Sequence, residues 1–484
     1  MKNKRNLFFL FIIFSIILLF TFSPISDPDF WWHIRTGQWI AENHSIPKTD
    51  PFSYTANNHP WIAHEWLSDL FIFTVYKLGS FRLLTLVFSL ITLAAFVLTY
   101  LRCYQKSRPY IAGMLLLLGA SASIPFWGIR PQMVSLLFSA AFLFLLDRYQ
   151  ETRRLRYLIP IPLLTMLWVN LHGGFLLGLG ILGIYILGNL IDLAIHKLKD
   201  KEAIEPSQSR LFISYCGAFL LSLLAALVNP NGFQILIYPF QTLTDASMQQ
   251  FIVEWVSPDF HQLYMLPFAL ILLLLIACGL SGSKRISTIK IILAVVFCFG
   301  ALRSVRHIPL FVIVIIPILA EQISSLLKTA VPSNNENRFI NRIIPWVICV
   351  LLTVVMAFAF VKVTNDQLKV EESEYPKAAA EWMVQNNLEG DIFSSYTWGG
   401  YLIWKLHPNN LVYIDGRMDV YDDSIVNSYQ SIYYTGADWL QLLDQSSTRL
   451  VLVETDSKLA YSLSSLTNWK IAYRDNQSVL FLKE

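Results

Sequence analysis

The sequence predicts an α-helical membrane protein that crosses the bilayer about eleven times and ends in a soluble α/β domain. Of the 484 residues, 55% are apolar and only 15% are charged, and the mean hydropathy is +0.48. Long apolar runs recur as far as residue 361, and the balance of charge changes sign just beyond them. A typical soluble domain carries about 25% charged residues. The composition therefore excludes a nucleic-acid-binding protein, a secreted soluble protein and an intrinsically disordered chain.

Eleven apolar runs are candidates for membrane spans, because a crossing takes about 20 apolar residues in a helix that satisfies its own backbone. They lie at 7–23, 82–101, 110–127, 131–147, 157–171, 173–195, 211–228, 262–280, 289–302, 308–327 and 343–361. Two or three of them are short for a span. The first follows three basic residues, as a signal peptide would, but no small-residue cleavage site comes after it. We therefore expect it to be retained as a helix.

The distribution of Lys and Arg predicts the orientation, because cytoplasmic connections carry an excess of them. With a cytoplasmic N-terminus, the inner connections hold 20 basic residues and the outer connections before the C-terminal domain hold seven. An odd number of crossings then places the C-terminal domain on the outer side. We expect a multi-pass protein of the plasma membrane with an extracytoplasmic C-terminal domain.

The predicted boundary between a membrane domain, residues 1–362, and an outer domain, residues 363–484, is also a change of composition. The outer domain has nine Lys and Arg against seventeen Asp and Glu, a net charge of −8, which leaves +11 on the membrane domain. Its pattern of apolar residues predicts one helix and five short strands. The helix is expected at 375–387 and the strands at 391–396, 410–416, 448–454, 469–474 and 478–483.

Two outer connections are too long to be simple turns. Residues 24–81 form a first loop with helical periodicity at 29–42 and 61–79, and its tryptophans predict helices that lie in the membrane interface. Residues 229–261 form a second loop, which contains an amphipathic stretch at 233–243.

Polar and charged residues gather at the predicted outer ends of the spans, whereas the inner ends carry mainly the basic residues that orientation explains. In a polytopic protein such residues mark functional sites. The outer set comprises Asp27, Asp29, His33, Arg35, His64, Glu65, Arg130, Asn170, His172, Glu254, Arg303, Arg306 and His307. We therefore expect a site at the outer face, open to both lipid and external water.

The segment SDPDFWWHIRTGQW at 26–39 is the strongest single candidate. It places two carboxylates, a histidine and an arginine within nine residues. Such a set could supply a base, a metal ligand and an anion clamp. The alternative is a charged interfacial helix in which Asp27 or Asp29 only caps the N-terminus.

The stretch DPDFWWHIR resembles the first outer-loop motif of the GT-C superfamily of membrane glycosyltransferases, particularly the catalytic subunit of oligosaccharyltransferase. The continuation IPKTDPFSYTANNHPWIAHEW is similar to the rest of that loop, with its DP dipeptide and second interfacial helix. The layout of the whole chain is also similar. The resemblance implies a GT-C-like fold in which Asp29 takes the place of the essential carboxylate of the family and Asp50 matches a second one.

These comparisons complete the set of candidate site residues. Asp29, Asp27 and Glu65 are the candidates for catalysis. The candidates for substrate binding are His33, Arg35, Asp50, Arg130, Glu254, Arg303, Arg306 and His307. The cofactor is left open, because the DxD pair of the family is missing from the second outer connection; a divalent cation, Mg²⁺ or Mn²⁺, is the candidate.

Two segments of the outer domain carry alternatives. SSYTWGGYLIW at 394–404 is similar in position and character to the WWDYG segment of the same family, but it lacks the acidic residue, which does not favour asparagine-linked protein glycosylation. IDGRMDVY at 414–421 is either an acceptor-binding segment or ordinary turn chemistry after a strand.

Several outer residues also have two interpretations. Arg303 and Arg306 either grip a lipid-linked phosphate through charge-assisted hydrogen bonds or extend toward anionic headgroups. The same holds for Arg130. Glu254 is either a second site carboxylate or an exposed loop residue, and His172 either belongs to the site or satisfies helix ends in a tight turn.

We expect the protein to transfer a sugar from a polyprenyl-phosphate carrier to a glycan, lipid or protein acceptor at the non-cytoplasmic face, within membrane lipid and without nucleic acid. Asp29 would accept the proton of the acceptor, and Arg303 and Arg306 would stabilise the leaving phosphate. The alternatives are a transporter or flippase of lipid-linked saccharide and a non-catalytic scaffold with an outer binding domain. A transporter would place ionisable residues near the bilayer midplane; this chain keeps them at one rim, which favours the enzyme.

Overall fold

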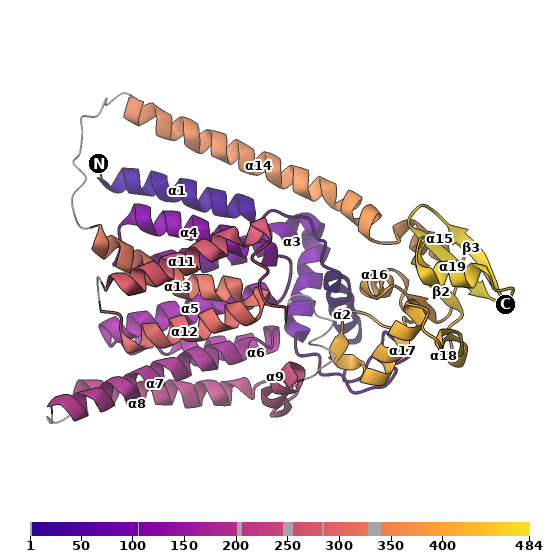
Figure 1. Cartoon of the computed structure of the whole chain (residues 1–484), viewed down its shortest axis with the longest axis horizontal. Coiled ribbons are helices and arrows are strands. Elements are labelled where there is room, and N and C mark those ends of the chain that lie inside the picture. Colours follow the sequence, from indigo (N-terminus) through magenta and orange to yellow (C-terminus); the bar gives the residue numbers. More distant parts are fainter. Residues whose placement is uncertain (1, 105, 201–205, 245–254, 283–284, 328–339) are drawn as a thin grey trace. The chain divides into compact units, whose positions relative to one another are not determined.

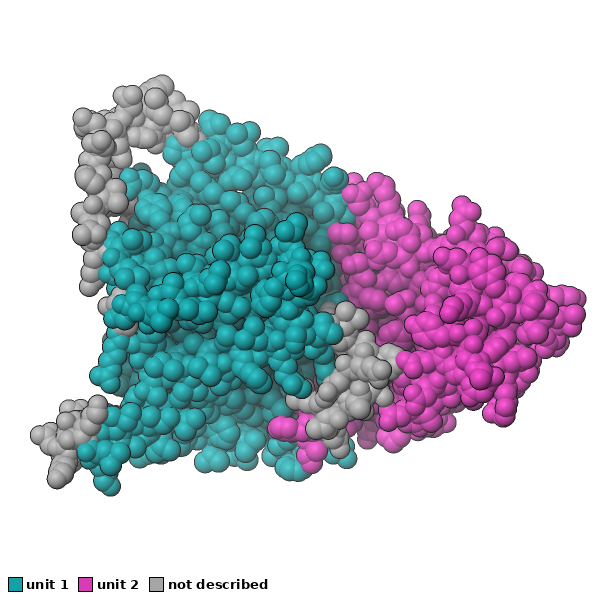
Figure 2. Space-filling model, in the orientation of Figure 1, with its two compact units in different colours: residues 1–23, 85–236, 252–363 teal, residues 24–84, 237–251, 364–484 magenta. Residues whose placement is uncertain are grey.

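The computed structural model describes residues 2–104, 106–200, 206–244, 255–282, 285–327 and 340–484 (Figure 1). The chain divides into two units, which Figure 2 distinguishes by colour. Unit 1 comprises residues 1–23, 85–236 and 252–363, and unit 2 comprises residues 24–84, 237–251 and 364–484. Unit 1 is a helical bundle, and unit 2 contains a small sheet with its helices.

Every apolar run predicted to span the membrane forms a helix in the described part of the chain. These helices are α1 (Lys2–Phe20), α3 (Trp66–Cys103), α4 (Pro109–Ser123), α5 (Gln132–Thr152), α6 (Pro160–Leu171), α7 (Phe175–Asp200), α8 (Pro206–Ala226), α11 (Leu266–Ser281), α12 (Thr288–Arg303), α13 (Ile308–Leu326) and α14 (Ile340–Glu374). Within the described residues, eight helices are long and apolar enough to cross a membrane, and α1 with the shorter helices α6 and α12 completes the predicted set. The predicted polytopic helical membrane fold is confirmed.

Helix α13 forms the core of unit 1. Most residues of Val305–Leu326 are buried, and α13 packs against α4, α5, α11 and α12. Its sequence IPLFVIVIIPILA is apolar on every side, which suits a helix surrounded by other helices. In Figure 1 the helices of unit 1 lie side by side along this core.

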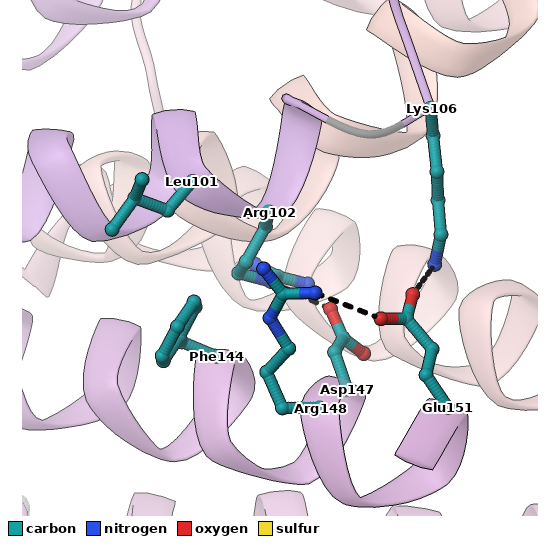
Figure 3. A pocket seen from close by; sticks show the side chains of 7 residues that line it. All are labelled: Leu101, Arg102, Lys106, Phe144, Asp147, Arg148 and Glu151. Carbon is teal, nitrogen blue, oxygen red and sulfur yellow. Dashed lines mark hydrogen bonds and ion pairs between the residues drawn. The ribbon is translucent and has the colours of Figure 1, made fainter.

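A buried arginine joins four helices of unit 1. Arg102 of α3 donates through Nε to Asp147 Oδ2 of α5 at 2.8 Å and through Nη1 to the Ile313 carbonyl of α13 at 2.7 Å. The hydroxyl of Tyr185 on α7 donates to the other oxygen of Asp147. Because a charge within a membrane bundle is tolerated when it is paired, this cluster joins the end of α3 to α5, α7 and α13. Figure 3 shows the small pocket around it, which is also lined by Leu101, Lys106, Phe144, Arg148 and Glu151.

Unit 2 begins with the helices of the first loop. The helix predicted at 29–42 is α2 (Asp29–Asn43). The helix predicted at 61–79 starts later, at Trp66, and forms the first part of α3, which is broken at Gly79 and Ser80. Ser80 has φ 54° and ψ −158°, a conformation rare for a residue with a side chain. The amphipathic stretch at 233–243 is α9 (Gln234–Thr244).

The C-terminal part of unit 2 is an α/β domain. Its strands are β1 (Ile392–Ser394), β2 (Leu450–Glu454), β3 (Trp469–Arg474) and β4 (Ser478–Lys483). They lie in the order β1-β2-β4-β3, with β1 parallel to β2 and the other pairs antiparallel. Its helices are α15 (Lys377–Gln385), α16 (Tyr396–Leu406), α17 (Asp423–Tyr433), α18 (Trp439–Gln445) and α19 (Lys458–Ser464). The predicted helix and four of the five predicted strands are therefore confirmed.

The prediction of a strand at 410–416 is wrong. Only Val412 pairs in this segment, as an isolated bridge to Ile392 and to Ser53. The chain then turns, because the side chains of Asp415 and Arg417 are buried in an ion pair that a continued strand would not form.

The pairing of Val412 with Ser53 makes the first loop part of the same unit as the C-terminal domain. Residues 24–84, which the sequence groups with the membrane domain, therefore pack with residues 364–484. The division of α14 between the units, at 363/364, falls one residue from the predicted boundary.

Candidate active site

The candidate site is built around the first turn of α2, where Asp29 is the first helical residue and is half-buried. The backbone N–H of Asp29 donates to Asp27 Oδ1 at 3.1 Å, and Trp32 Nε1 donates to Asp29 Oδ1 at 3.1 Å. Asp27 therefore accepts the first free N–H of the helix, while the carboxylate of Asp29 lies where the helix dipole stabilises negative charge.

The C-terminal domain approaches Asp29 through Gly416. A Cβ atom on Gly416 would lie 1.8 Å from Asp29 Oδ1 and 3.2 Å from Trp32 Nε1, so any side chain there would displace the carboxylate. Helix α16 also packs on α2, and a Cβ atom on Gly400 would lie 2.9 Å from the carbonyl oxygen of Pro28. The two segments that the sequence left with alternatives, 394–404 and 414–421, both therefore lie against the start of α2.

One turn further along α2, His33 lies among carboxylates. Its Nδ1 is 2.6 Å from Asp69 Oδ1, and its Nε2 is 3.8 Å from Glu65 Oε2. All three side chains are buried. Burial lowers the pKa of His33, but the neighbouring carboxylates of Asp69, Glu65 and Asp29 raise it above its usual value. The neighbouring carboxylates thus favour the protonated form of the imidazole.

A second histidine extends this line of polar groups. Glu65 Oε1 is 3.6 Å from His64 Nε2, and the imidazole of His64 lies against the ring of Tyr238, with centroids 4.7 Å apart. The hydroxyl of Tyr238 donates to Asp419 Oδ2 at 2.8 Å. Burial lowers the pKa of His64, but Glu65 and Asp419 raise it to about 9, so the ring is cationic at neutral pH.

Sequence reasoning did not select Tyr238 or Asp419 as site residues. Tyr238 was part of an amphipathic stretch, and Asp419 was noted only as part of IDGRMDVY. The sequence did contain a usable signal. Asp415, Arg417 and Asp419 follow the apolar residues Val412 and Ile414, and charged side chains next to a buried run require partners from elsewhere in the chain.

Arg417 pairs with two carboxylates, those of Asp50 and Asp415. Its Nη1 is 2.6 Å from Asp50 Oδ1, and its Nη2 is 2.6 Å from Asp415 Oδ2; none of the three side chains is exposed. The guanidinium also lies over the rings of Phe52 and Trp61, 5.0 Å and 4.8 Å from their centroids. This ion-pair cluster of Asp50, Asp415 and Arg417 joins the first loop to the segment that carries Gly416.

The carboxylate of Asp50 binds neighbours in its own loop and Arg417 of the ion-pair cluster. Its carboxylate accepts the backbone N–H groups of Phe52 and Ser53 at 3.0 Å and 3.1 Å, as well as the Ser53 hydroxyl. The geometry favours a role in holding the loop, and the predicted role of Asp50 in substrate binding stays a prediction.

Arg35 is bound at the end of α16. Its Nη2 lies 2.8 Å from His407 Nδ1 and donates to the His407 carbonyl at 3.1 Å. Burial and the neighbouring guanidinium lower the pKa of His407 to about 4, so the neutral ring accepts the bond from Arg35. The arginine thereby links α2 to the residues after α16.

Arg130 belongs to unit 1. It follows the short helix η1 (Ile124–Phe126) and precedes α5. The residue is half-buried, and its side chain folds beside Gly128. Glu254 lies outside the described residues.

The three remaining predicted residues lie at one turn of unit 1. Arg303 ends α12 and is exposed, while Arg306 and His307 are half-buried in the short helix η5 (Val305–His307). The turn is held by the N–H of Val305, which donates to the carbonyl of Val256 at 3.0 Å.

His172 occupies a tight turn between α6 and α7 of unit 1. Its Nδ1 accepts the N–H of Gly174 at 2.9 Å and lies 2.7 Å from the hydroxyl of Ser135. Trp168 Nε1 in turn donates to Ser135 at 2.7 Å. The alternative in which His172 satisfies a helix end is confirmed.

The predicted site residues thus fall into two sets. Unit 2 holds Asp27, Asp29, His33, Arg35, Asp50 and Glu65, and unit 1 holds Arg130, Arg303, Arg306 and His307. Within unit 2, Asp29, His33 and Glu65 lie together with Asp69 in one cluster, the acidic cluster. Arg35 is bound to His407, and Asp50 is paired with Arg417. The catalytic and binding roles of all these residues stay predictions.

The described residues do not fit a metal site. Across these ranges, no group of three or more His, Cys, Asp and Glu side chains is arranged to hold a metal ion. Beside His33 and His64, the carboxylates of Asp69 and Glu65 are engaged with the imidazoles, whose pKa values their charges raise. No catalytic step through Mg²⁺ or Mn²⁺ is therefore derived for this chain.

The fold is that of solved membrane glycosyltransferases, although no protein-family model and no curated protein matches the chain in sequence. The oligosaccharyltransferase of Archaeoglobus fulgidus in its apo form matches with a TM-score of 0.53 and 13% identity, over 92% of this chain and 69% of that one. AglB of the same organism, in complex with an inhibitory peptide and a dolichol-phosphate, matches with a TM-score of 0.56 and 12% identity, over 100% and 74%. ArnT from Cupriavidus metallidurans, bound to undecaprenyl phosphate, matches with a TM-score of 0.52 and 12% identity, over 98% and 97%. The chain therefore has the GT-C fold, as the resemblance of its first loop predicted.

Proposed function

We propose that the protein is a membrane glycosyltransferase that moves a sugar from a polyprenyl-phosphate-linked donor to a glycan, lipid or protein acceptor. The observation that carries the proposal is the position of Asp29, half-buried at the N-terminus of α2 at the head of an acidic cluster, in a chain with the GT-C fold. The AglB and ArnT structures hold a dolichol-phosphate and undecaprenyl phosphate. A donor of that chemical class suits a helical membrane protein, because it reaches the site through lipid.

The proposed reaction is a displacement at the anomeric carbon of the donor sugar. The acceptor oxygen forms a bond to that carbon as its proton passes to Asp29, and the bond from the carbon to the phosphate oxygen breaks with its electrons going to the phosphate. Positive charge develops on the sugar ring in such a transition state. The carboxylates of Asp29 and Glu65 therefore lower the barrier electrostatically, and Asp27 positions Asp29 by ordering the first turn of α2.

The phosphate of the donor requires cations. The sequence offers Arg303 and Arg306, with Arg130 and His307, as candidates for charge-assisted hydrogen bonds to it. In the predicted orientation all of them belong to outer connections, where the positive-inside rule offers no other reason for basic residues.

Mass spectrometry of glycans and lipid-linked sugars tests the proposal directly. Cells that lack the protein are expected to lose one glycan modification and to accumulate sugar-charged polyprenyl phosphate, because the donor is no longer consumed. The wild-type chain should reverse both changes. If the Asp29→Asn chain reverses both as well as the wild type does, the result would favour transport over transfer; unchanged glycans and donors in the deletion would contradict the proposal.

The proposal also includes an orientation, with a cytoplasmic N-terminus and the C-terminal domain outside the plasma membrane. Reporter fusions after residues 156, 260 and 370 are expected to report inside, outside and outside, because 20 basic residues on one side against seven on the other orient the spans. An inside signal at residue 370 would put Asp29 and the C-terminal domain in different compartments and would contradict the model.

A further inference from the structure

We propose that Asp419, in the C-terminal domain, is a second carboxylate of the glycosyl-transfer site, held at the acidic cluster by Tyr238. This inference rests on the proposed function and deepens it. It gives the segment 414–421 a role other than acceptor binding or turn formation, the two alternatives that its sequence suggests.

Two segments far from Asp419 in the chain, those of Tyr238 and His64, lie next to it in the structure. The residue is half-buried in the short helix η6 (Met418–Val420), and its Oδ2 accepts the hydroxyl of Tyr238 from α9 at 2.8 Å. The ring of Tyr238 lies against His64, which continues to Glu65 at 3.6 Å. Asp419 is therefore joined to the cluster that begins at Asp29, and all of these residues belong to unit 2.

Asp419 and Asp29 also act on a common neighbour. Tyr396, the first residue of α16, is half-buried. Desolvation and the charges of Asp29, Asp415 and Asp419 raise the pKa of its hydroxyl well above the usual value. Gly416, three residues before Asp419, approaches Asp29 so closely that a Cβ atom would overlap the carboxylate. The same short segment thus brings its backbone and one carboxylate to the start of α2.

The two aspartates of the segment have different surroundings. Asp415 is fully enclosed and bound by Nε and Nη2 of Arg417 at 2.8 Å and 2.6 Å, so its charge is neutralised in place. Asp419 instead accepts from the hydroxyl of Tyr238 and lies near the cationic ring of His64. Burial raises the pKa of Asp419, and the charge of His64 opposes that rise. The ion pair anchors the segment, and Asp419 is the carboxylate that it presents to the site.

In the transfer step, Asp419 acts by its charge. The bond between the acceptor oxygen and the anomeric carbon forms, the bond to the phosphate oxygen breaks, the acceptor proton goes to Asp29 and the electron pair leaves with the phosphate. Asp419 takes no proton. It stabilises the positive charge that develops on the sugar ring, which is where preorganised opposite charge lowers a barrier.

The test compares four full-length chains in deletion cells: wild type, Asp29→Asn, Asp419→Asn and Asp422→Asn. Asp422 is a matched control, because it is an exposed aspartate directly after the segment. Its side chain accepts the N–H of Ile425 at 3.0 Å as the cap of α17, and Asn caps equally well. Product is measured by mass spectrometry, and the thermal midpoint of each purified chain reports folding. We expect Asp419→Asn to lower product by about 100-fold or more, as loss of an electrostatic group does, and Asp422→Asn to match wild type.

The outcomes separate this inference from the function on which it rests. No product from the wild type defeats the proposed function itself, whereas wild-type product from Asp419→Asn overturns only the second carboxylate. Should Asp419→Asn fail to fold, Tyr238→Phe decides, because it removes one hydrogen bond to a charged group and is expected to lower product by about tenfold with an unchanged midpoint. Full product from that variant overturns the inference, and partial recovery with Asp419→Glu supports it, since the charge is kept.

Discussion

Asp29→Asn is expected to lower glycosyl transfer by at least about 100-fold while leaving the chain folded. Asparagine keeps the size of the side chain and an oxygen that can accept from Trp32 Nε1, but it has no charge and cannot take a proton. A positioned base contributes roughly 100- to 10,000-fold to a rate. The measurement is product per amount of protein in complemented deletion cells, with the thermal midpoint of the purified variant as the measure of folding.

Asp27→Asn is the matched control for this prediction. Asp27 accepts the N–H of Asp29, and asparagine fills such a position about as well as aspartate, so near-normal transfer is expected. Full transfer by Asp29→Asn together with loss in Asp27→Asn or Asp50→Asn would assign the base elsewhere. If all three variants keep full transfer, transport or scaffolding becomes the better explanation of the cluster.

The helical part of the fold could be predicted from the sequence because its causes are local. A membrane span satisfies its own backbone, so about 20 apolar residues are enough to specify a helix wherever they occur. The eleven runs accordingly became helices even where they were short, as in α6 with 12 residues. The loop helices at α2 and α9 were found for the same reason, because amphipathic periodicity is local.

The site could be predicted only where its signal was local. Asp27, Asp29 and His33 share one short segment, and their proximity follows from the helix that contains them. The pairing of Arg417 with Asp50 spans 367 positions in the chain, and that of Tyr238 with Asp419 spans 181. No periodicity reports such contacts. The short apolar run within 410–416 therefore predicted a strand, whereas in the structure the segment turns and its charged residues form tertiary ion pairs.

The role of Arg35 shows a different limit. From the sequence it was an anion clamp, because an arginine beside two carboxylates and a histidine suits phosphate binding. In the structure its guanidinium is bound to His407, whose pKa of about 4 keeps the ring neutral at pH 7. Arg35 and His407 lie 372 positions apart in the chain, so the sequence around Arg35 does not show that its guanidinium has this partner.

Arg417→Met is expected to destabilise unit 2 by about 3–5 kcal/mol, because removing one member of a buried ion pair leaves the others as uncompensated charges. Here two carboxylates, Asp50 and Asp415, would remain with unexposed side chains. The measurement is the thermal or denaturant midpoint of the purified full-length chain. Lys483→Met is the control, since Lys483 pairs with Asp444 at a partly exposed surface site at 2.8 Å, where loss of a pair costs about 0–1 kcal/mol.

The same substitution is expected to abolish transfer as well, because Arg417 anchors the segment whose Gly416 lies against Asp29. This double effect distinguishes it from Asp29→Asn, which should lose transfer at normal stability. Adding Asp50→Asn and Asp415→Asn to Arg417→Met should recover part of the lost stability, because the buried negative charges are removed together with their partner. A midpoint for Arg417→Met equal to that of Lys483→Met would mean that the ion-pair cluster does not hold the first loop to the C-terminal domain, and the positioning of Gly416 would then need another cause.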